Sequence, residues 1–296
     1  MRKKLLFLAL AIGIIIALCG CGKSDDAPAV KTAAPPRDAV LTIKVLDIGQ
    51  GDSMLIFSGK DTVLIDTGDF NKKKQIVSLL KRENVKDIDI AFATHPHSDH
   101  IGCMTEIMKH FNVKKIVDSG QTHTPRFFRE YLETVKKKNI PFEIVQRGNI
   151  YELDGGTKLE VIWPRQPFLK GTKGDLNNNS IVMRLTNGDF SMLLTADIQR
   201  EAEEHLLKEA KSKLKCNVIK VPHHSSNGSS SWNFIKALHA KDAIISCSSD
   251  NDYGYPKEKV IKRYKDNDMN IYVTAFDGTI TIKTDGKNYT VEKEKK

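Results

Sequence analysis

The stretch HPHSDH, residues 95–100, places three imidazoles and one carboxylate within six consecutive positions. In an extended loop the side chains of His95 and His97 point the same way, because alternate residues share a face. Asp99 and His100 come after the turn that leads into the next element. One short segment can therefore supply ligands to two metal ions, whereas the competing interpretation is a histidine-rich surface turn.

Other strand ends offer further ligands. Asp197 closes LLTAD, and His223 and His224 close IKVPHH. Neutral imidazoles and carboxylates suit Zn²⁺ or Mn²⁺, and a catalytic ion needs an open position for water. An aspartate between two such ions can bridge them at roughly 3.5–4 Å. Alternatively, Asp197 caps the following helix. Of His223 and His224, we expect one to be a ligand and the other to face substrate or to be structural.

The body of the chain alternates strands with helices. LTIKVLD, SMLIFS and TVLIDTG form a meander, IDIAFAT (88–94) is a buried strand, and a hairpin turns at Asn187-Gly188. Two halves, each mixing sheet and helix, predict one domain with two sheets packed face to face and helices outside. The expected helices lie near 70–83, from Ile101, from Pro125 to about Lys138, near 199–213, from Ser231 and from Pro256.

The N-terminal region indicates export. Arg2, Lys3 and Lys4 precede an apolar run that ends at Leu18, which is typical of a signal peptide. The residues before Cys21 resemble a lipobox, which would make Cys21 the lipidated residue. We expect a lipoprotein signal peptide over 1–20, a flexible linker over 21–40 and the folded domain over 41–292. The protein would be lipid-anchored at the extracellular face of the membrane, or secreted; an uncleaved anchor is the alternative.

Composition adds little about the substrate. The formal net charge is +9, but several cations lie in the signal and the C-terminal tail, so the folded body is only mildly basic. That balance is compatible with an anionic substrate and equally with simple solubility. Cys103, Cys216 and Cys247 are odd in number and imply no disulfide framework. The sequence does not indicate an oligomeric state.

The motifs THPHSDHIG, LIDTG, LLTAD and VPHHSS resemble those of the metallo-β-lactamase superfamily, whose fold is a four-layered αββα sandwich with metals at one sheet edge. LDIGQGDSMLI, NNNSIVMRL and VPHHSS resemble the hydrolase domain of the competence DNA-channel protein ComEC, and related teichoic acid phosphorylcholine esterases. The resemblance covers about 41–285. It implies a Zn²⁺- or Mn²⁺-dependent hydrolase.

Carried over position by position, the resemblance implies ligands in two sets. His95 and His97 would hold the first ion, Asp99 and His100 the second, and Asp197 would bridge them, while His223 or His224 completes the second ion. Asp99 would also orient the attacking water, and His224 or Tyr255 would donate a proton to the substrate. Asp66, Asp52 and Asn177 would support the ligands or hold phosphate.

Two departures from the family pattern affect this site. The stretch LNNNS (176–180) carries no histidine where full-set members have one, so the first ion lacks an expected ligand. His123, an amide or water could fill that place, and we favour His123. Tyr255 stands where many relatives have histidine, and its phenol cannot act as an imidazole acid.

These features favour a phosphodiesterase acting on DNA or, as a runner-up, on phosphorylcholine-bearing teichoic acid. A lactonase or β-lactamase is a second enzyme class, and a silent surface-anchored binding module is the non-enzymatic alternative. His110, His205 and His239 have no apparent partners and are expected to be structural or solvated. Trp232 is expected to be a core aromatic at a helix start, with base stacking as the alternative.

Overall fold

The structure is a computed structural model that describes residues 40–295. The predicted signal peptide (1–20), the lipidation site Cys21 and the predicted linker up to residue 39 lie outside the described residues. None of the helices within the described part is long and apolar enough to cross a bilayer.

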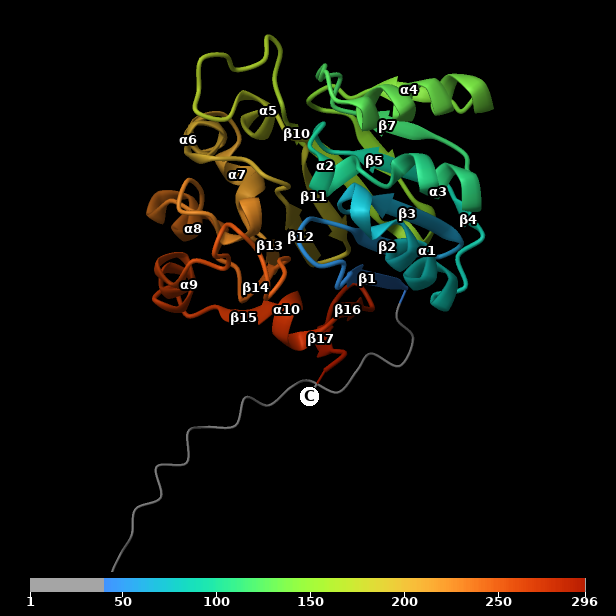
Figure 1. The fold of residues 1–296 in the computed structure, drawn as a ribbon. Coiled ribbons are helices and arrows are strands. Elements are labelled where there is room, and N and C mark those ends of the chain that lie inside the picture. The colour runs from blue at the N-terminus through green and yellow to red at the C-terminus, as the bar shows by residue number, and fades with distance from the viewer. Residues whose placement is uncertain (1–39, 296) are drawn as a thin grey trace, which may run out of the picture. The chain divides into compact units, whose positions relative to one another are not determined.

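Two mixed sheets form the centre of the domain (Figure 1). The first has eight strands in the order β17 (Tyr289–Lys293), β16 (Ile280–Thr284), β1 (Leu41–Val45), β2 (Met54–Ser58), β3 (Asp61–Ile65), β5 (Ile90–Ala93), β7 (Ile116–Asp118) and β8 (Phe142–Ile144). The second has seven strands in the order β15 (Asn270–Val273), β14 (Asp242–Ile245), β13 (Val218–Lys220), β12 (Phe190–Leu194), β11 (Val182–Asn187), β10 (Lys158–Trp163) and β9 (Ile150–Glu152). A separate pair joins β4 (Asp87–Ile88) and β6 (Asn112–Val113).

Helices cover the outer faces of both sheets, with the first group and the second group on opposite sides in Figure 1. The first group is η1 (Phe70–Lys72), α1 (Lys73–Arg82), α2 (Ser98–Ile101), α3 (Met104–His110) and α4 (Arg126–Lys138). The second is α5 (Asp175–Asn178), α6 (Arg200–Glu209), α7 (Lys211–Leu214), η3 (Pro222–Ser225), α8 (Trp232–Leu238) and α9 (Glu258–Lys265). Two short turns complete the fold, η2 (Asp154–Gly156) and α10 (Thr274–Asp277).

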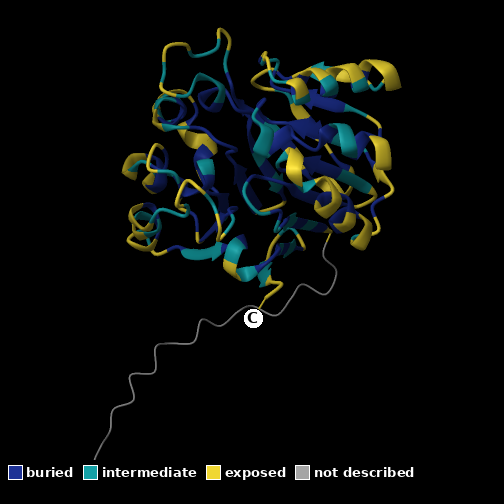
Figure 2. Cartoon of the chain, viewed as in Figure 1, coloured by how far each residue is buried: buried dark blue, intermediate teal, exposed yellow. Residues whose placement is uncertain are grey.

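Three clusters of buried apolar side chains hold the helices and sheets together. The central cluster packs the two sheets against each other through side chains such as Ile43, Phe92 and Met183. The other two clusters join α1, α3 and α4 to the first sheet, and α6, α8 and α9 to the second. Buried strands and outward-facing exposed helix surfaces are visible in Figure 2. The predicted four-layered αββα sandwich is confirmed, because three apolar interfaces separate four layers.

Some local predictions need correction. The helix after the histidine cluster begins at Ser98 instead of Ile101, so Asp99 and His100 are helical. Trp232 is not a core aromatic: its side chain is 44% exposed, and Phe234 two residues later fills the core instead. The hairpin turn is centred on Gly188 and Asp189, because Asn187 still pairs with Phe190.

Two helical histidines have partners that the sequence interpretation missed. His110 contacts Glu106, and His205 contacts Glu209, each at 2.9 Å. The partners stand four positions away on the same helix, where side chains share a face. Both histidines nevertheless remain surface residues at a distance from the predicted ligands.

The chain's topology brings several strand ends to one edge. β3, β5 and β7 run parallel in the first sheet, and β12, β13 and β14 run parallel in the second. The two edges meet where the backbone N–H of Ile181 donates to the carbonyl of Thr94 at 2.9 Å. Loops that leave these strands can therefore converge on one place.

Candidate metal centre

Four of the predicted ligands lie together at this edge. Metal-binding atoms of Asp99, His100, Asp197 and His224 all lie within 4.8 Å of one another. Asp197 Oδ2 is central, 3.3 Å from His100 Nε2 and 3.4 Å from His224 Nε2. Asp197 does not cap a helix, because α6 begins at Arg200 and its N-cap residue is Gln199. The structure therefore favours the ligand interpretation of Asp197 over the capping one.

The loop Gly49–Asp52 packs directly on the helix that carries two of these ligands. The backbone N–H of Asp52 donates to the carbonyl of Asp99 at 3.1 Å. Gly51 has a φ of +117°, and a Cβ there would lie 2.1 Å from the Asp99 carbonyl oxygen. Only glycine permits both the conformation and this close approach. Gly51 thus lets the loop fix the position of Asp99.

Asp66 holds His100 in one orientation. Its Oδ2 lies 2.8 Å from His100 Nδ1, and both carboxylate oxygens also accept hydrogen bonds from Thr94. With Nδ1 bonded to this carboxylate, Nε2 is the ring nitrogen that faces Asp197, at 3.3 Å. Such a carboxylate–histidine contact is the usual support of a metal ligand. Asp66 therefore fixes the orientation of the His100 ring.

The turn η3 aims one of its two histidines into the cluster. His223, His224 and Ser225 all have positive φ values, of 49°, 52° and 71°. Three consecutive non-glycine residues in this region are strained, and such strain is concentrated at functional sites. The Nδ1–H of His224 donates to the Ser246 carbonyl at 2.8 Å. Its Nε2 consequently faces the carboxylates.

His95 and His97 form the second part of the site. His95 Nε2 lies 3.1 Å from His97 Nδ1, and the His95 ring centroid is 4.1 Å from that of His100. The two side chains do point the same way, as expected for alternate residues of a loop. Burial lowers the pKa of both imidazoles. Both are therefore neutral near pH 7, which is the form that binds metals.

The stretch that lacks the family's histidine offers one amide to the site. Asn177 lines the cavity, and its buried Oδ1 has no hydrogen-bond partner within the described part of the chain. Asn178 and Asn179 instead bond to neighbouring backbone: Asn178 accepts from the Gln199 N–H and Asn179 from the Leu169 N–H. Asn177 is thus the member of this stretch that faces the predicted ligands.

His123 and His223 lie on the walls of the site and not within the four-residue cluster. The His123 ring centroid is 6.1 Å from that of His97, and the side chain is partly exposed. His223 Nε2 is 3.9 Å from Asp197 Oδ2 and 3.4 Å from the Asn177 amide. The Gln199 amide lies 3.3 Å from His223 Nδ1. His224, and not His223, meets the other ligand atoms.

The electrostatics of the cluster fit a cation. Burial would raise the pKa of Asp197, but the imidazoles of His224 and His100 hold it well below its usual value. Asp197 therefore stays ionised inside the protein. His100 Nε2, His224 Nε2 and Asp197 Oδ1 are buried atoms without a hydrogen-bond partner among residues 40–295. Unpartnered polar atoms are costly, and a divalent ion held by nitrogen and oxygen ligands would satisfy all three.

A cavity of about 390 Å³ opens above these residues. Tyr253 and Tyr255 stack in one wall with ring centroids 5.3 Å apart. Tyr255 is half-buried, whereas Tyr253 is 59% exposed. Phe127 and Gln50 also line the cavity. Sequence reasoning singled out Tyr255 but missed Tyr253, Phe127 and Gln50, because no metal-ligand pattern includes such residue types.

The comparison with known families agrees with this geometry. The sequence profile of the Metallo-beta-lactamase superfamily matches residues 46–249. The chain belongs to the metallo-β-lactamase superfamily. ComE operon protein 3 of Bacillus subtilis is 30% identical over 257 residues, which cover 80% of this chain and 32% of that protein. Competence protein ComA of Neisseria gonorrhoeae is 27% identical over 253 residues, covering 84% of this chain and 33% of that protein.

The chain therefore spans about a third of the length of the curated relatives that it matches. Among solved structures, the superfamily protein YhfI of Bacillus subtilis superposes with a TM-score of 0.52 at 12% identity, covering 79% of this chain and 96% of that one. That likeness concerns the fold alone. The superfamily fold, the matched motifs and the cluster of donors together identify a candidate site for divalent metal ions.

Proposed function

We propose that this chain is an extracellular, metal-dependent phosphodiesterase that cleaves DNA. The observation that carries the proposal is the cluster of Asp99, His100, Asp197 and His224 at the floor of a cavity. The resemblance to competence proteins favours DNA as the substrate. One or two ions of Zn²⁺ or Mn²⁺ would be held there.

The ligands divide into two sets around Asp197. His100, His224 and Asp99 would hold one ion, and His95 and His97 would hold the other. The remaining place at the second set is open to the Asn177 amide oxygen or to His123. When bound, the ions would lower the pKa of a water molecule and offset the charge that develops on the phosphate.

Other residues of the cavity would act on the substrate directly. Asp99 is 25% exposed towards the cavity, so its carboxylate can orient the attacking water. Burial raises the pKa of Tyr255, so its phenol stays protonated at neutral pH and can donate to a phosphate oxygen or to the leaving group. His223, placed between two amides, can hold a non-bridging phosphate oxygen.

The proposed location rests on the N-terminal sequence. The apolar run and the lipobox-like residues would direct export. Cys21 would then carry the lipid that holds the domain at the extracellular face of the cell membrane. Labelling with a radioactive fatty acid tests this part separately. Incorporation that Cys21→Ala abolishes supports the anchor, and an unlabelled chain contradicts it.

The catalytic proposal is tested with the purified protein, single- and double-stranded DNA, and bis(p-nitrophenyl) phosphate as a generic diester. Each substrate is incubated with Zn²⁺, with Mn²⁺ and with chelator. We expect metal-dependent DNA cleavage that His97→Ala and Asp197→Ala abolish. His205→Ala is the matched control, because this histidine lies on a helix surface beside Glu209 and lines neither the cavity nor the groove beside α1 and α3.

Three outcomes would contradict the proposal in different ways. Turnover of the generic ester without cleavage of DNA would limit it to a phosphodiesterase of another substrate. Release of phosphorylcholine from teichoic acid in place of DNA cleavage would favour the runner-up. Binding of DNA without turnover under every metal condition would favour the silent binding module.

A further inference from the structure

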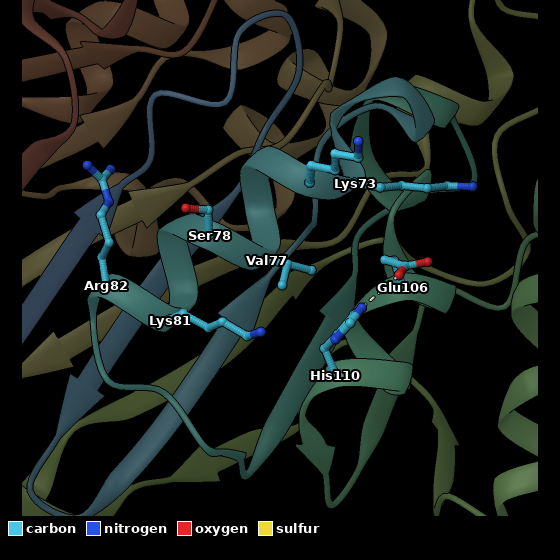
Figure 3. A pocket seen from close by; sticks show the side chains of 8 residues that line it. Lys73, Val77, Ser78, Lys81, Arg82, Glu106 and His110 are labelled. Atoms are coloured by element: carbon cyan, nitrogen blue, oxygen red, sulfur yellow. Dashed lines mark hydrogen bonds and ion pairs between the residues drawn. The ribbon is translucent and has the colours of Figure 1, made fainter.

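A groove of about 690 Å³ lies on the outer face of the first helical layer, beside α1 and α3. Its lining includes Lys73, Lys74, Lys81, Arg82 and Glu106, as Figure 3 shows for most of these side chains. Among residues 40–295, the three lysines have no carboxylate partner within 4.0 Å, whereas Glu106 already contacts Lys109 and His110. The groove is therefore a site of unbalanced positive charge.

The basic side chains continue to the rim of the metal cavity. Lys72, at the end of η1, crosses over Gly49, where a Cβ would lie 3.1 Å from Lys72 Cε. The next residue, Gln50, lines the metal cavity itself. Gly102, which follows α2, packs so closely on η1 that a Cβ there would lie 2.3 Å from the backbone nitrogen of Phe70. The helix α2 is thus in direct contact with η1, where the row of basic residues formed by Lys72, Lys73, Lys74 and Lys81 begins.

The dimensions of the row fit a nucleic-acid strand. α1 has ten residues, which at 1.5 Å per residue is about 15 Å. A single strand carries one phosphate on every nucleotide, so a row of this length meets more than one consecutive phosphate. Exposed aromatics accompany the charges: Phe70 is 52% exposed, and Tyr253 is 59% exposed at the metal cavity. Cationic side chains beside exposed aromatic rings are typical of single-strand binding, because the bases stack on the rings. A polyol phosphate has no aromatic ring and cannot stack in this way.

We propose that Lys72, Lys73, Lys74 and Lys81 form a track for the phosphate backbone of a single nucleic-acid strand whose scissile bond lies at the metal cavity. This inference rests on the proposed function and adds that the substrate is a polymer bound well beyond the cleaved bond. Membrane lipid and teichoic acid are the competing polyanions for the same charges.

The test measures binding of a fluorescent 20-nucleotide oligo(dT) to the purified protein in chelator, so that no cleavage occurs. The variant Lys73→Gln/Lys74→Gln/Lys81→Gln removes three charges from the track. Lys136→Gln/Lys137→Gln/Lys138→Gln is the matched control, because it removes three exposed lysines from the end of α4. These lysines likewise form no ion pair with any residue of 40–295. Thermal unfolding of each variant checks that the fold is retained.

We expect the track variant to lose affinity by at least about tenfold at 0.1 M salt, and the control to retain it. The slope of log K against log salt should become shallower by about 2, since each lost contact to a single strand removes about 0.7. Unchanged affinity and slope in the track variant, or equal loss in the control, would overturn the proposal. The proposal would also be overturned if the track variant lost binding to phosphatidylglycerol vesicles or to glycerol-phosphate teichoic acid while it still bound oligo(dT) normally.

The two proposals fail separately. If oligo(dT) binding depends on the track but no metal supports cleavage, the track stands and the phosphodiesterase proposal falls. If wild-type protein cleaves DNA but the track variant binds normally, the phosphodiesterase stands and the track falls.

Discussion

Lys220 Nζ lies 2.6 Å from Asp52 Oδ2, and both side chains are fully buried. This ion pair stands behind the cluster, because the other oxygen of Asp52 lies 3.5 Å from Nδ1 of His224. A buried charge without its partner is strongly destabilising, so the two residues depend on each other.

Lys220→Met should therefore lower the free energy of unfolding by about 3–5 kcal/mol, since it leaves Asp52 uncompensated. The double variant Lys220→Met/Asp52→Asn should lose less than Lys220→Met alone. Urea unfolding in the presence of chelator measures both without a contribution from bound metal. A cost below about 1 kcal/mol for the single variant, with additive effects, would show that the pair is not coupled.

His223 and His224 should differ in their effect on metal affinity. His224→Ala removes an imidazole whose Nε2 meets Asp197 and Asp99, so we expect a loss of at least about 100-fold. His223→Ala should weaken metal binding much less and should raise KM for a phosphodiester. Competition with a zinc indicator gives the affinities, and steady-state rates give KM. Equal losses of affinity in both variants would contradict the assignment.

Asp66→Asn should lower metal affinity by about 10- to 100-fold with little change in fold. Asparagine tolerates the positive φ of 58° at this position, but it no longer provides the charge that orients His100. The same indicator competition measures the effect. Asp89→Asn is the control, because Asp89 pairs with Lys114 on the surface. Wild-type affinity in Asp66→Asn would mean that His100 needs no such support.

Asp118 should make stability fall as pH rises. Burial raises the pKa of Asp118 to about 6 from an ordinary value of 3.8, while the Gly120 N–H and the Tyr131 hydroxyl donate to its carboxylate. Between pH 4 and 6 the folded state binds more protons than the unfolded state, so deprotonation costs stability in that window.

Asp118→Asn removes this titration. The stability of the variant relative to wild type should therefore increase by about 2 to 3 kcal/mol from pH 4 to pH 7, at 1.36 kcal/mol per pKa unit. Urea unfolding at several pH values measures the difference, in which the other titrating groups cancel. A difference that does not vary with pH would show that Asp118 ionises normally.

The layered fold and the convergence of ligands were predictable because both follow from local signals. His95, Asp197 and His224 each follow a buried strand, and these strand ends meet at one sheet edge once the sheets pack face to face. The family motifs indicated the same fold. Long-range strand pairing left no such signal: β16 and β17 return from the C-terminus to pair beside β1, although the sequence suggested two sheets built from two halves.

The finer parts of the site depend on tertiary contacts. The backbone conformation of η3 determines that His224, and not His223, faces the cluster. This conformation has three consecutive positive φ values in a segment without glycine, which the sequence does not predict. From the sequence, Lys220 is expected to be an ordinary solvent-facing residue of a strand. Its contact with Asp52 in the structure explains why it is buried. Trp232 and Tyr253 are aromatic residues that the fold leaves exposed, and residue type alone favours burial for both.

The most direct test of the account is elemental analysis of the purified, folded protein. The cluster of Asp99, His100, Asp197 and His224 predicts at least one equivalent of Zn²⁺ or Mn²⁺ per chain, and a substantial loss of it in Asp197→Ala. Folded protein that contains no stoichiometric transition metal, even after incubation with either ion, would contradict the account.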